Sequence, residues 1–221
     1  PLKEGLSTLN AGAFQSKNFR FKRSGFRIRE DGAIEANEGY FFGDVVLGST
    51  IRTVDSVEEL QPSIDEVSAS GGGSIYLAPG TYYPTDHIDI PSNVYLIGAS
   101  RSSCIIDFAG GAFSLRSIGT SGDHNINILI KDLTVQNSST RGVYLQYLDT
   151  SVIDGLDGYG NGTGIEFDNC IAVGLLASGG YFDGNGTGIK ISNSEAVSVY
   201  FTTSTNSTSG HGMEVSSSSN A

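Results

Sequence analysis

One short phrase occurs four times in the second half of the chain, each time led by a glycine. The four leading glycines are separated by 22, 24 and 24 residues: Gly142, Gly164, Gly188 and Gly212. Such regular spacing is typical of architectures in which each repeat stacks on its neighbours. Within each copy apolar and polar residues alternate, which predicts a β-strand with one buried face. The sequence therefore predicts a β-solenoid, in which equivalent residues form columns about 4.8 Å apart.

The repeated strand defines two inward and two outward columns of side chains. The inward columns are apolar throughout, which supports the register: Val143, Ile165, Ile189, Met213 and Leu145, Phe167, Ile191, Val215. The outward columns are mostly polar: Tyr144, Glu166, Lys190, Glu214 and Gln146, Asp168, Ser192, Ser216. Asn169 and Asn193 follow two of the strands, and we expect their side chains to stack and to bond to neighbouring turns.

Composition excludes several partners. The formal net charge is −11 and the isoelectric point is near 4.5, which disfavours nucleic acid and anionic membranes as partners. No apolar run approaches the roughly 20 residues that span a bilayer, so we expect no membrane insertion. The two cysteines, Cys104 and Cys170, are expected to be buried thiols, because their separation along the solenoid exceeds the roughly 7 Å that a disulfide allows.

The N-terminal part has its own pattern. Basic residues of segment 17–29 alternate with aromatic ones, which we interpret as a solvated strand face beside acidic neighbours. Asp31-Gly32 predicts a hairpin turn within a compact β meander, Gly25–Val45. This segment resembles the "F-x-I-x-x-D-G-x-I-E-A-x-x-G-x-F-x-G" modules of phage tail fibre and tail-tip proteins. The resemblance implies a place in the virion tail between an attachment part and a receptor-facing part, with other tail proteins as partners and homotrimeric assembly.

Residues 55–69 predict the one clear helix of the chain. Val57, Leu60, Ile64 and Val67 are spaced to share one helical face. Asp55 and Glu58 are spaced as a capping box. Pro62 is expected near the first position of the main helix, after a short initial turn. The glycines of segment 71–73 are expected to end it.

Two motifs after this helix carry a second resemblance. They are "GGGSIYLAPGTYY", residues 71–83, and "IPSNVYLIG", residues 90–98. Together with the preceding helix they resemble the opening of pectate-lyase-like right-handed β-helix proteins, which include phage tailspikes, polysaccharide lyases, polygalacturonase-type hydrolases and alginate epimerases. The resemblance covers residues 51–221 and implies that the helix caps the N-terminal end of the solenoid.

The predicted fold class is all-β. We expect a right-handed parallel β-helix with an N-terminal capping helix over residues 51–221, preceded by a small β-meander module or stalk over residues 1–50. The chain starts at Pro1 without an initiator methionine, and the repeats run almost to Ala221. Because an uncapped solenoid end exposes apolar cross-section, we expect further coils or another domain beyond Ala221.

The outward columns are the candidate carbohydrate surface. Tyr144, Gln146, Glu166 and Lys190 are candidate sugar-binding residues, and the carboxylates of Glu166, Asp168 and Glu214 are candidate catalytic groups. Two carboxylates two residues apart on one strand lie roughly 6–7 Å apart, a separation compatible with glycosidase chemistry. The alternative is an exposed ladder of Glu166, Lys190 and Glu214, in which each ion pair contributes about 0–1 kcal/mol.

Signatures that would name one enzyme are missing. Gly210-His211-Gly212 matches the "G-H-G" of polygalacturonase-like hydrolases, but the accompanying "N-T-D", "D-D" and "R-I-K" motifs and the epimerase motif "Y-G-x-D-P-H" are absent. Lys190 alone is too little for a lyase that binds a substrate carboxylate. Segment 183–188 begins like an EF-hand loop, but Ser194 stands where the bidentate glutamate belongs. We therefore predict no metal and no cofactor.

These observations favour a phage tail fibre or tailspike protein that recognises a host cell-surface polysaccharide. Degradation of that polysaccharide is a further activity that this hypothesis allows. The expected location of the protein is the virion tail or the extracellular space. Two alternatives remain open. One is a polysaccharide-active enzyme, either a lyase, a glycoside hydrolase or a uronate epimerase. The other is a structural adhesin stalk.

Overall fold

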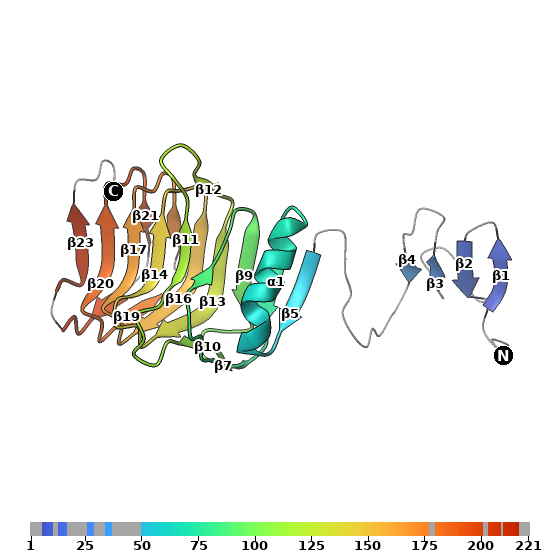
Figure 1. Cartoon of the computed structure of the whole chain (residues 1–221), viewed down its shortest axis with the longest axis horizontal. Helices are drawn as coiled ribbons and strands as arrows, with labels where there is room; N and C mark the ends of the chain where they lie inside the picture. The colour runs from blue at the N-terminus through green and yellow to red at the C-terminus, as the bar shows by residue number, and fades with distance from the viewer. Residues whose placement is uncertain are drawn as a thin grey trace. The chain divides into compact units, whose positions relative to one another are not determined.

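The computed structural model divides the chain into two compact units, Pro1–Val45 and Val46–Ala221 (Figure 1). The residues that the structure describes are 6–10, 13–16, 26–28, 34–36, 50–176, 180–200, 203–208 and 210–216.

The first unit holds one four-stranded antiparallel sheet. Its strands pair in chain order: β1 (Leu6–Asn10), β2 (Ala13–Ser16), β3 (Phe26–Ile28) and β4 (Ile34–Ala36). Strands β3 and β4 pair around the predicted hairpin, with Ile28 opposite Ile34. The Asp31-Gly32 turn itself lies outside the described residues. The hairpin of β1 and β2 adds two strands to the meander that the sequence analysis did not predict.

In the second unit, successive coils supply strands to three parallel sheets, which we call sheets I, II and III (Figure 1). Sheet I contains β5 (Thr50–Val54), β6 (Gly73–Leu77), β9 (Val94–Gly98), the first halves of β13 (Leu129–Gln136) and β16 (Val152–Tyr159), β18 (Gly174–Leu176) and β21 (Ser198–Val199). Sheet II contains β7 (Gly80–Tyr82), β10 (Cys104–Asp107), the second halves of β13 and β16, β19 (Tyr181–Asp183) and β22 (Thr203–Thr205).

Sheet III holds the repeated phrase. Its strands are β8 (Ile88–Asp89), β11 (Leu115–Ile118), β14 (Arg141–Gln146), β17 (Thr163–Asp168), β20 (Thr187–Ser192) and β23 (Met213–Ser216). A short parallel pair, β12 (Asn125–Ile126) and β15 (Leu148–Asp149), lies between sheets III and I along the chain. This arrangement confirms the predicted parallel β-solenoid.

Strands β13 and β16 bend from sheet I into sheet II at one residue each. Asp132 and Gly155 have left-handed backbones there, with φ of 53° and 60°. A single left-handed residue interrupts the alternation of side chains, so that the residues on both sides of the bend turn inward. Accordingly Ile130 and Leu133, on either side of Asp132, are both fully buried.

The predicted register of sheet III is confirmed residue by residue. Val143 pairs with Ile165, which pairs with Ile189, which pairs with Met213, and the second apolar column runs in the same way. The first three members of each column are buried, but Met213 and Val215 are 46% and 49% exposed. Strand β23 is the last strand of sheet III that the structure describes, so these two side chains have described neighbours on one side only.

Helix α1 (Val57–Ala69) packs on the first coils of the solenoid (Figure 1). Leu60, Ile64 and Val67 enter the apolar core as predicted, with Val57 packed against it. Two details of the prediction are wrong. The N-cap is Ser56 without a side-chain cap bond, so no capping box forms, and Pro62 lies inside a continuous helix. The bond that Pro62 cannot donate would go to the carbonyl of Glu58, which is an exposed residue.

The helix also occupies the edge of sheet III. The backbone N–H of Asp89 in β8 donates to Gln61 Oε1 at 2.8 Å, and Gln61 Nε2 donates back to the Asp89 carbonyl at 3.2 Å. The side-chain amide of Gln61 thus takes the place of a neighbouring strand. Such cover prevents further strand pairing at this edge.

Both cysteines are buried free thiols, as predicted. Burial raises the pKa of the Cys170 thiol to about 11, so this group stays protonated at physiological pH.

Two buried asparagines connect the turns between sheets II and III. Asn161 Nδ2 donates to the Val135 carbonyl at 3.1 Å, and its Oδ1 accepts the Ser138 N–H at 2.9 Å. Asn185 Oδ1 accepts the Asn161 N–H at 2.9 Å, and its Nδ2 donates to the Gly158 carbonyl at 3.0 Å. These side chains satisfy backbone groups that the turns would otherwise bury without partners. Asn161 and Asn185 thus link successive turns, but they are not the asparagines for which stacking was predicted, Asn169 and Asn193.

Replacing Asn161 with alanine should destabilise the solenoid. The change leaves the Val135 carbonyl and the Ser138 N–H without partners, and each buried unpaired group costs about 1–3 kcal/mol. We expect the free energy of unfolding of Asn161→Ala to fall by about 2–4 kcal/mol in urea titrations. Ser139→Ala, an exposed change in the adjacent turn, is the control and should stay within about 0.5 kcal/mol of wild type. Equal stability of both variants would contradict the role assigned to Asn161.

Candidate functional site

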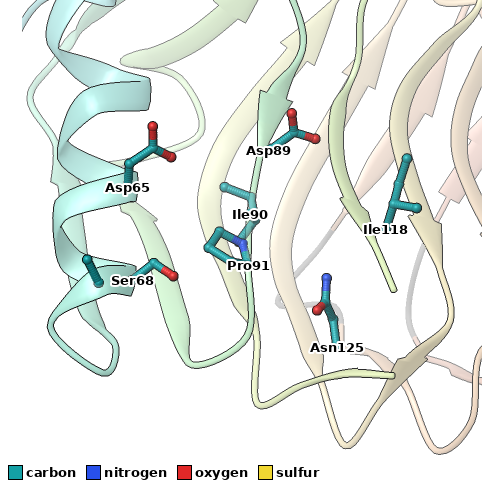
Figure 2. Close-up of a pocket in the computed structure, with 8 residues that line it drawn as sticks. Asp65, Ser68, Asp89, Ile90, Pro91, Ile118 and Asn125 are labelled. Atoms are coloured by element: carbon teal, nitrogen blue, oxygen red, sulfur yellow. The ribbon is translucent and has the colours of Figure 1, made fainter. Parts of the chain in front are cut away.

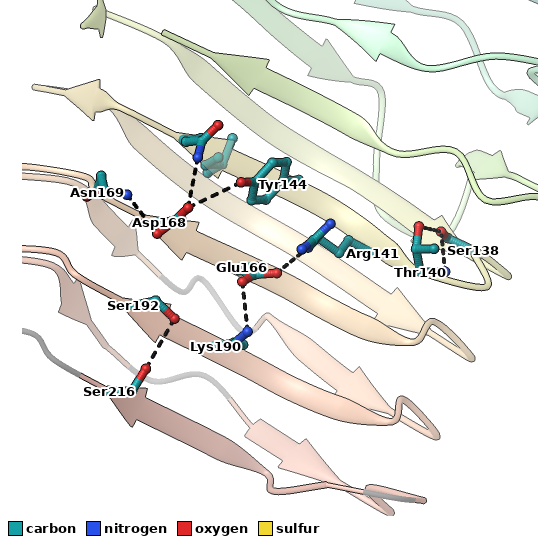
Figure 3. Close-up of polar contacts among 12 residues, drawn as sticks. Ser138, Thr140, Arg141, Tyr144, Glu166, Asp168, Asn169, Lys190, Ser192 and Ser216 are labelled. Carbon is teal, nitrogen blue, oxygen red and sulfur yellow. Dashed lines mark hydrogen bonds and ion pairs between the residues drawn. The ribbon is translucent and has the colours of Figure 1, made fainter. Parts of the chain in front are cut away.

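The outward face of sheet III carries the candidate site (Figure 3). The backbone register places Tyr144 beside Glu166, Glu166 beside Lys190 and Lys190 beside Glu214. Gln146, Asp168, Ser192 and Ser216 form the second outward column, as predicted from the sequence. Side-chain contacts then join five of the six predicted site residues into two adjacent clusters.

The first cluster is centred on Glu166. Its Oε2 accepts a short hydrogen bond from Nε of Arg141, and its Oε1 lies 2.9 Å from Nζ of Lys190. Figure 3 shows the carboxylate between the two cations. Glu166 is only 5% exposed, so this ion-pair network is less accessible to solvent than the predicted surface ladder. Its members also differ, because Arg141 takes the place that the prediction gave to Glu214.

Arg141 is the site residue that sequence reasoning missed. It opens β14 and shares the parity of the inward residues Val143 and Leu145, so the alternating pattern assigns it to the inside. At the first position of the strand the long side chain instead reaches Glu166 on the next coil. Its Cζ also lies 4.4 Å from the centroid of the Tyr144 ring, within the range of a cation–π contact. The residue type could have indicated this contact, because an arginine at an inward position is almost never buried unless it is paired with a carboxylate.

The second cluster is centred on Asp168. Its Oδ2 accepts hydrogen bonds from Gln146 Nε2 at 2.9 Å and Tyr144 OH at 3.3 Å. Its Oδ1 accepts bonds from Asn169 Nδ2 at 2.9 Å and Asn193 Nδ2 at 3.3 Å. Both carboxylate oxygens are therefore held in a fixed orientation. The two asparagines at the strand exits bond to this aspartate rather than to each other.

Tyr144 connects the two clusters. Burial, together with the negative charge of Asp168 and the hydrogen bond to it, raises the pKa of Tyr144 to about 12. The phenol therefore stays protonated at neutral pH and acts as a donor.

Glu214 lies apart from both clusters. Lys190 pairs with Glu166, and in the described part of the chain Lys190 forms no ion pair with Glu214. Next to it, the hydroxyls of Ser192 and Ser216 lie 3.3 Å apart. Glu214 thus shares the column of the candidate site without contributing to its polar network.

The motifs that resembled other sites lie in turns. His211 is an exposed turn residue before β23. Asp183, which opens the EF-hand-like segment, accepts hydrogen bonds from Thr205 Oγ1 at 2.8 Å and Asn206 Nδ2 at 2.6 Å. Among the described residues no group of three or more His, Cys, Asp or Glu side chains is placed to hold a metal ion. No helix in this part of the chain is long and apolar enough to cross a membrane.

A separate cavity of about 510 Å³ opens between α1 and the first strands of sheet III (Figure 2). Its two carboxylates have partners within the fold. Asp89 forms a two-bond ion pair with Arg116, at 2.5 and 3.2 Å, and Asp65 accepts a bond from Gln61 at 2.8 Å. The first pair links two strands of sheet III and the second lies within α1, while the bonds of Gln61 to the Asp89 backbone join the helix to the sheet. We therefore assign the lining a structural role.

Glu166→Gln should destabilise the fold because it removes the negative charge that Arg141 and Lys190 share. The substitution keeps the shape of the side chain but leaves Arg141 and Lys190 beside a neutral amide. Because both cations are partly exposed, we expect a loss of about 1–3 kcal/mol, less than the 3–5 kcal/mol of a fully buried pair. Urea denaturation would measure it. Glu214→Gln, in the same column, is the matched control and should be nearly neutral; a similar loss in both variants would refute the assignment.

The raised pKa of Tyr144 predicts a pH dependence of stability. Tyrosine in an unfolded chain has a pKa of about 10, so the folded state, at about 12, holds its proton longer. The stabilisation is complete below about pH 10 and is lost as the pH rises towards 12. The difference in unfolding free energy between wild type and Tyr144→Phe should therefore decrease from pH 9 to pH 12. A difference that does not change with pH would show that the phenol ionises equally easily in both states.

Comparison with known proteins supports the fold. No protein-family model matches the chain. An alignment of 113 positions, which covers 47% of this chain and 12% of the other protein, is 31% identical to the mannuronan C5-epimerase AlgE6 of Azotobacter vinelandii. The chain therefore spans a small part of this curated relative.

The chain resembles two solved structures to different degrees. The ORF18 protein of Geobacillus virus E2 superimposes with a TM-score of 0.57 at 18% identity, over 80% of this chain and 42% of that one. A glycosyl hydrolase-like protein from Parabacteroides merdae gives a TM-score of 0.45 at 11% identity, over 73% of this chain and 86% of that one. With its stacked parallel sheets and N-terminal capping helix, the chain has a right-handed parallel β-helix fold.

Proposed function

We propose that the chain is part of a phage tail fibre or tailspike protein that recognises a host cell-surface polysaccharide with the outward face of sheet III. A phage-encoded protein shares the fold, and the N-terminal segment resembles modules of phage tail proteins. In this proposal the protein acts in the virion tail, outside the host cell, as a homotrimer bound to other tail proteins.

The observation that carries the proposal is the fixed polar network around Asp168. Tyr144 and Gln146 from one coil and Asn193 from the second coil along converge on the carboxylate of Asp168, which lies on the coil between them. Saccharide sites need polar groups in fixed directions beside an aromatic surface. Here the groups are oriented before any ligand arrives, which lowers the entropy lost on binding. Arg141 covers one face of the Tyr144 ring, and a sugar would pack against the other.

The same contacts favour recognition over cleavage. A glycosidase needs one carboxylic acid that can give its proton to the leaving oxygen. Each oxygen of Glu166 already has a cationic partner, and each oxygen of Asp168 already accepts two hydrogen bonds. Glu214 lies outside the network. The predicted catalytic roles of these three residues therefore have less support than a binding role.

One observation favours an enzyme as the second candidate. The alignment of 113 positions that is 31% identical to a mannuronan C5-epimerase points to polysaccharide chemistry as well as to fold. Incubation with neutral and acidic bacterial polysaccharides, followed by assays for new reducing ends, unsaturated uronates and altered uronate stereochemistry, would detect hydrolase, lyase or epimerase activity.

Binding of bacterial polysaccharides, measured by affinity electrophoresis and calorimetry, tests the proposal. We expect Tyr144→Ala and Asp168→Asn each to weaken binding by about tenfold or more, as loss of a central contact does. Tyr76→Ala removes an exposed tyrosine from sheet I and should bind like wild type. If light scattering shows a trimer and no polysaccharide binds, a structural stalk is favoured. If both site variants bind as well as wild type, the saccharide binds elsewhere on the protein.

A further inference from the structure

Sheet II carries a second hollow that the proposed site does not use. A cavity of about 440 Å³ lies over its outward face, beside the loop between β9 and β10. Its walls combine an arginine, an aspartate, a glutamine, a tyrosine, serines and one apolar side chain: Arg101, Asp157, Gln136, Tyr159, Ser102 and Ile105. The lining comes from three successive coils, those of β10, β13 and β16.

Asp157 is the centre of this cavity lining. Its Oδ1 accepts a hydrogen bond from Arg101 Nη1 at 3.0 Å and another from the Tyr181 N–H at 2.9 Å. Its side chain is only 13% exposed, whereas that of Arg101 is 32% exposed. Thr134 Oγ1 donates to the Arg101 carbonyl at 2.8 Å and fixes the loop that carries the arginine. These contacts come from four successive coils and hold the carboxylate and the guanidinium in place.

Two tyrosines provide an aromatic surface along the same face. The rings of Tyr159 and Tyr181 lie 6.0 Å apart, and both side chains are partly exposed. Tyr159 pairs across the sheet with Gln136, whose amide donates to Asp107 at 2.8 Å. A row of planar polar groups thus lies beside two aromatic rings. This combination suits a sugar, whose C–H faces pack on rings while its hydroxyls exchange hydrogen bonds with amides and carboxylates.

The charges of the solenoid decide which class of sugar fits. Residues 51–221 contain eighteen acidic residues and only six basic ones. Every one of the six has a carboxylate partner: Arg52 with Glu66, Arg101 with Asp157, Arg116 with Asp89, Lys131 with Asp154, and Arg141 and Lys190 with Glu166. A polyanionic glycan would need cations that are not already neutralised, and the acidic surface would repel it. A neutral glycan meets neither obstacle.

We propose that the outward face of sheet II is a second saccharide-binding groove that takes a neutral glycan, with Tyr159 and Tyr181 as the stacking surface and Arg101, Gln136 and Asp157 as the hydroxyl-binding groups. The inference rests on the proposed function, since it concerns the same polysaccharide-recognising protein. It adds a separate site and specifies the ligand class. With sites on two faces of one solenoid, a glycan-covered surface could be held by more than one contact per chain.

The test uses the whole chain and defined glycans. Dextran, mannan and galactan are the neutral probes, and polygalacturonate and hyaluronate are the acidic ones. We expect binding to at least one neutral probe and none to the acidic probes. Tyr159→Ala should weaken the neutral interaction about tenfold. Ser102→Trp, which places bulk in the groove from an exposed loop position without removing a packed side chain, should do the same.

Controls separate this inference from the proposed function. Tyr76→Ala should bind like wild type, and unchanged circular dichroism and melting temperature would show that the groove variants are folded. If Tyr144→Ala abolishes neutral-glycan binding while Tyr159→Ala and Ser102→Trp leave it unchanged, the second groove is refuted and the site on sheet III stands. Binding to acidic probes alone refutes the neutral ligand class but keeps polysaccharide recognition. If no neutral, acidic or bacterial polysaccharide binds at all, both proposals fail.

Discussion

The parallel pairing of one coil with the next determines every surface of this protein. Backbone hydrogen bonds set neighbouring strands about 4.8 Å apart, and the inward apolar columns fix their register, because a slip by one residue would turn each buried side chain outward. The contacts of Glu166 and Asp168 follow from that register. Each carboxylate is satisfied by side chains of adjacent coils, so neither cluster would exist on an isolated strand.

The fold was predictable because the repeat of apolar and glycine residues can be read directly from the sequence. The spacing of the leading glycines and the alternation after them gave the parallel strands, and the apolar columns of sheet III gave their register. The buried face of helix α1 was also predicted correctly, since Leu60, Ile64 and Val67 are buried as expected. The wrongly predicted details, the helix cap and the position of Pro62, depend on solvent exposure and on local backbone geometry. Pro62 is tolerated inside the helix because its missing bond concerns an exposed turn, and no periodic pattern contains that information.

The candidate site was predictable only in part. Alternation placed Tyr144, Gln146, Glu166, Asp168 and Lys190 on one face, but it could not tell which of them would touch. Lys190 lies between two glutamates in its column and pairs with Glu166, which also pairs with Arg141. The same limit applies to the asparagines. Whether a turn buries its asparagine amide depends on the path of the backbone. The amides of Asn161 and Asn185 are buried and bond to backbone groups in the interior.

The distribution of charge connects stability with recognition. Stacking in register places equivalent residues side by side, so an acidic solenoid brings carboxylates close together on neighbouring coils, where like charges destabilise the sheet. The six basic residues of the β-helix counter this effect, because each ion pair links segments that are neighbours in space but distant in sequence, up to 56 residues apart for Arg101 and Asp157. Cations that hold coils together are already neutralised when a ligand arrives. In the proposed recognition, binding on such a surface depends on hydroxyl, amide, carboxylate and aromatic groups, which suit neutral sugars better than charged ones.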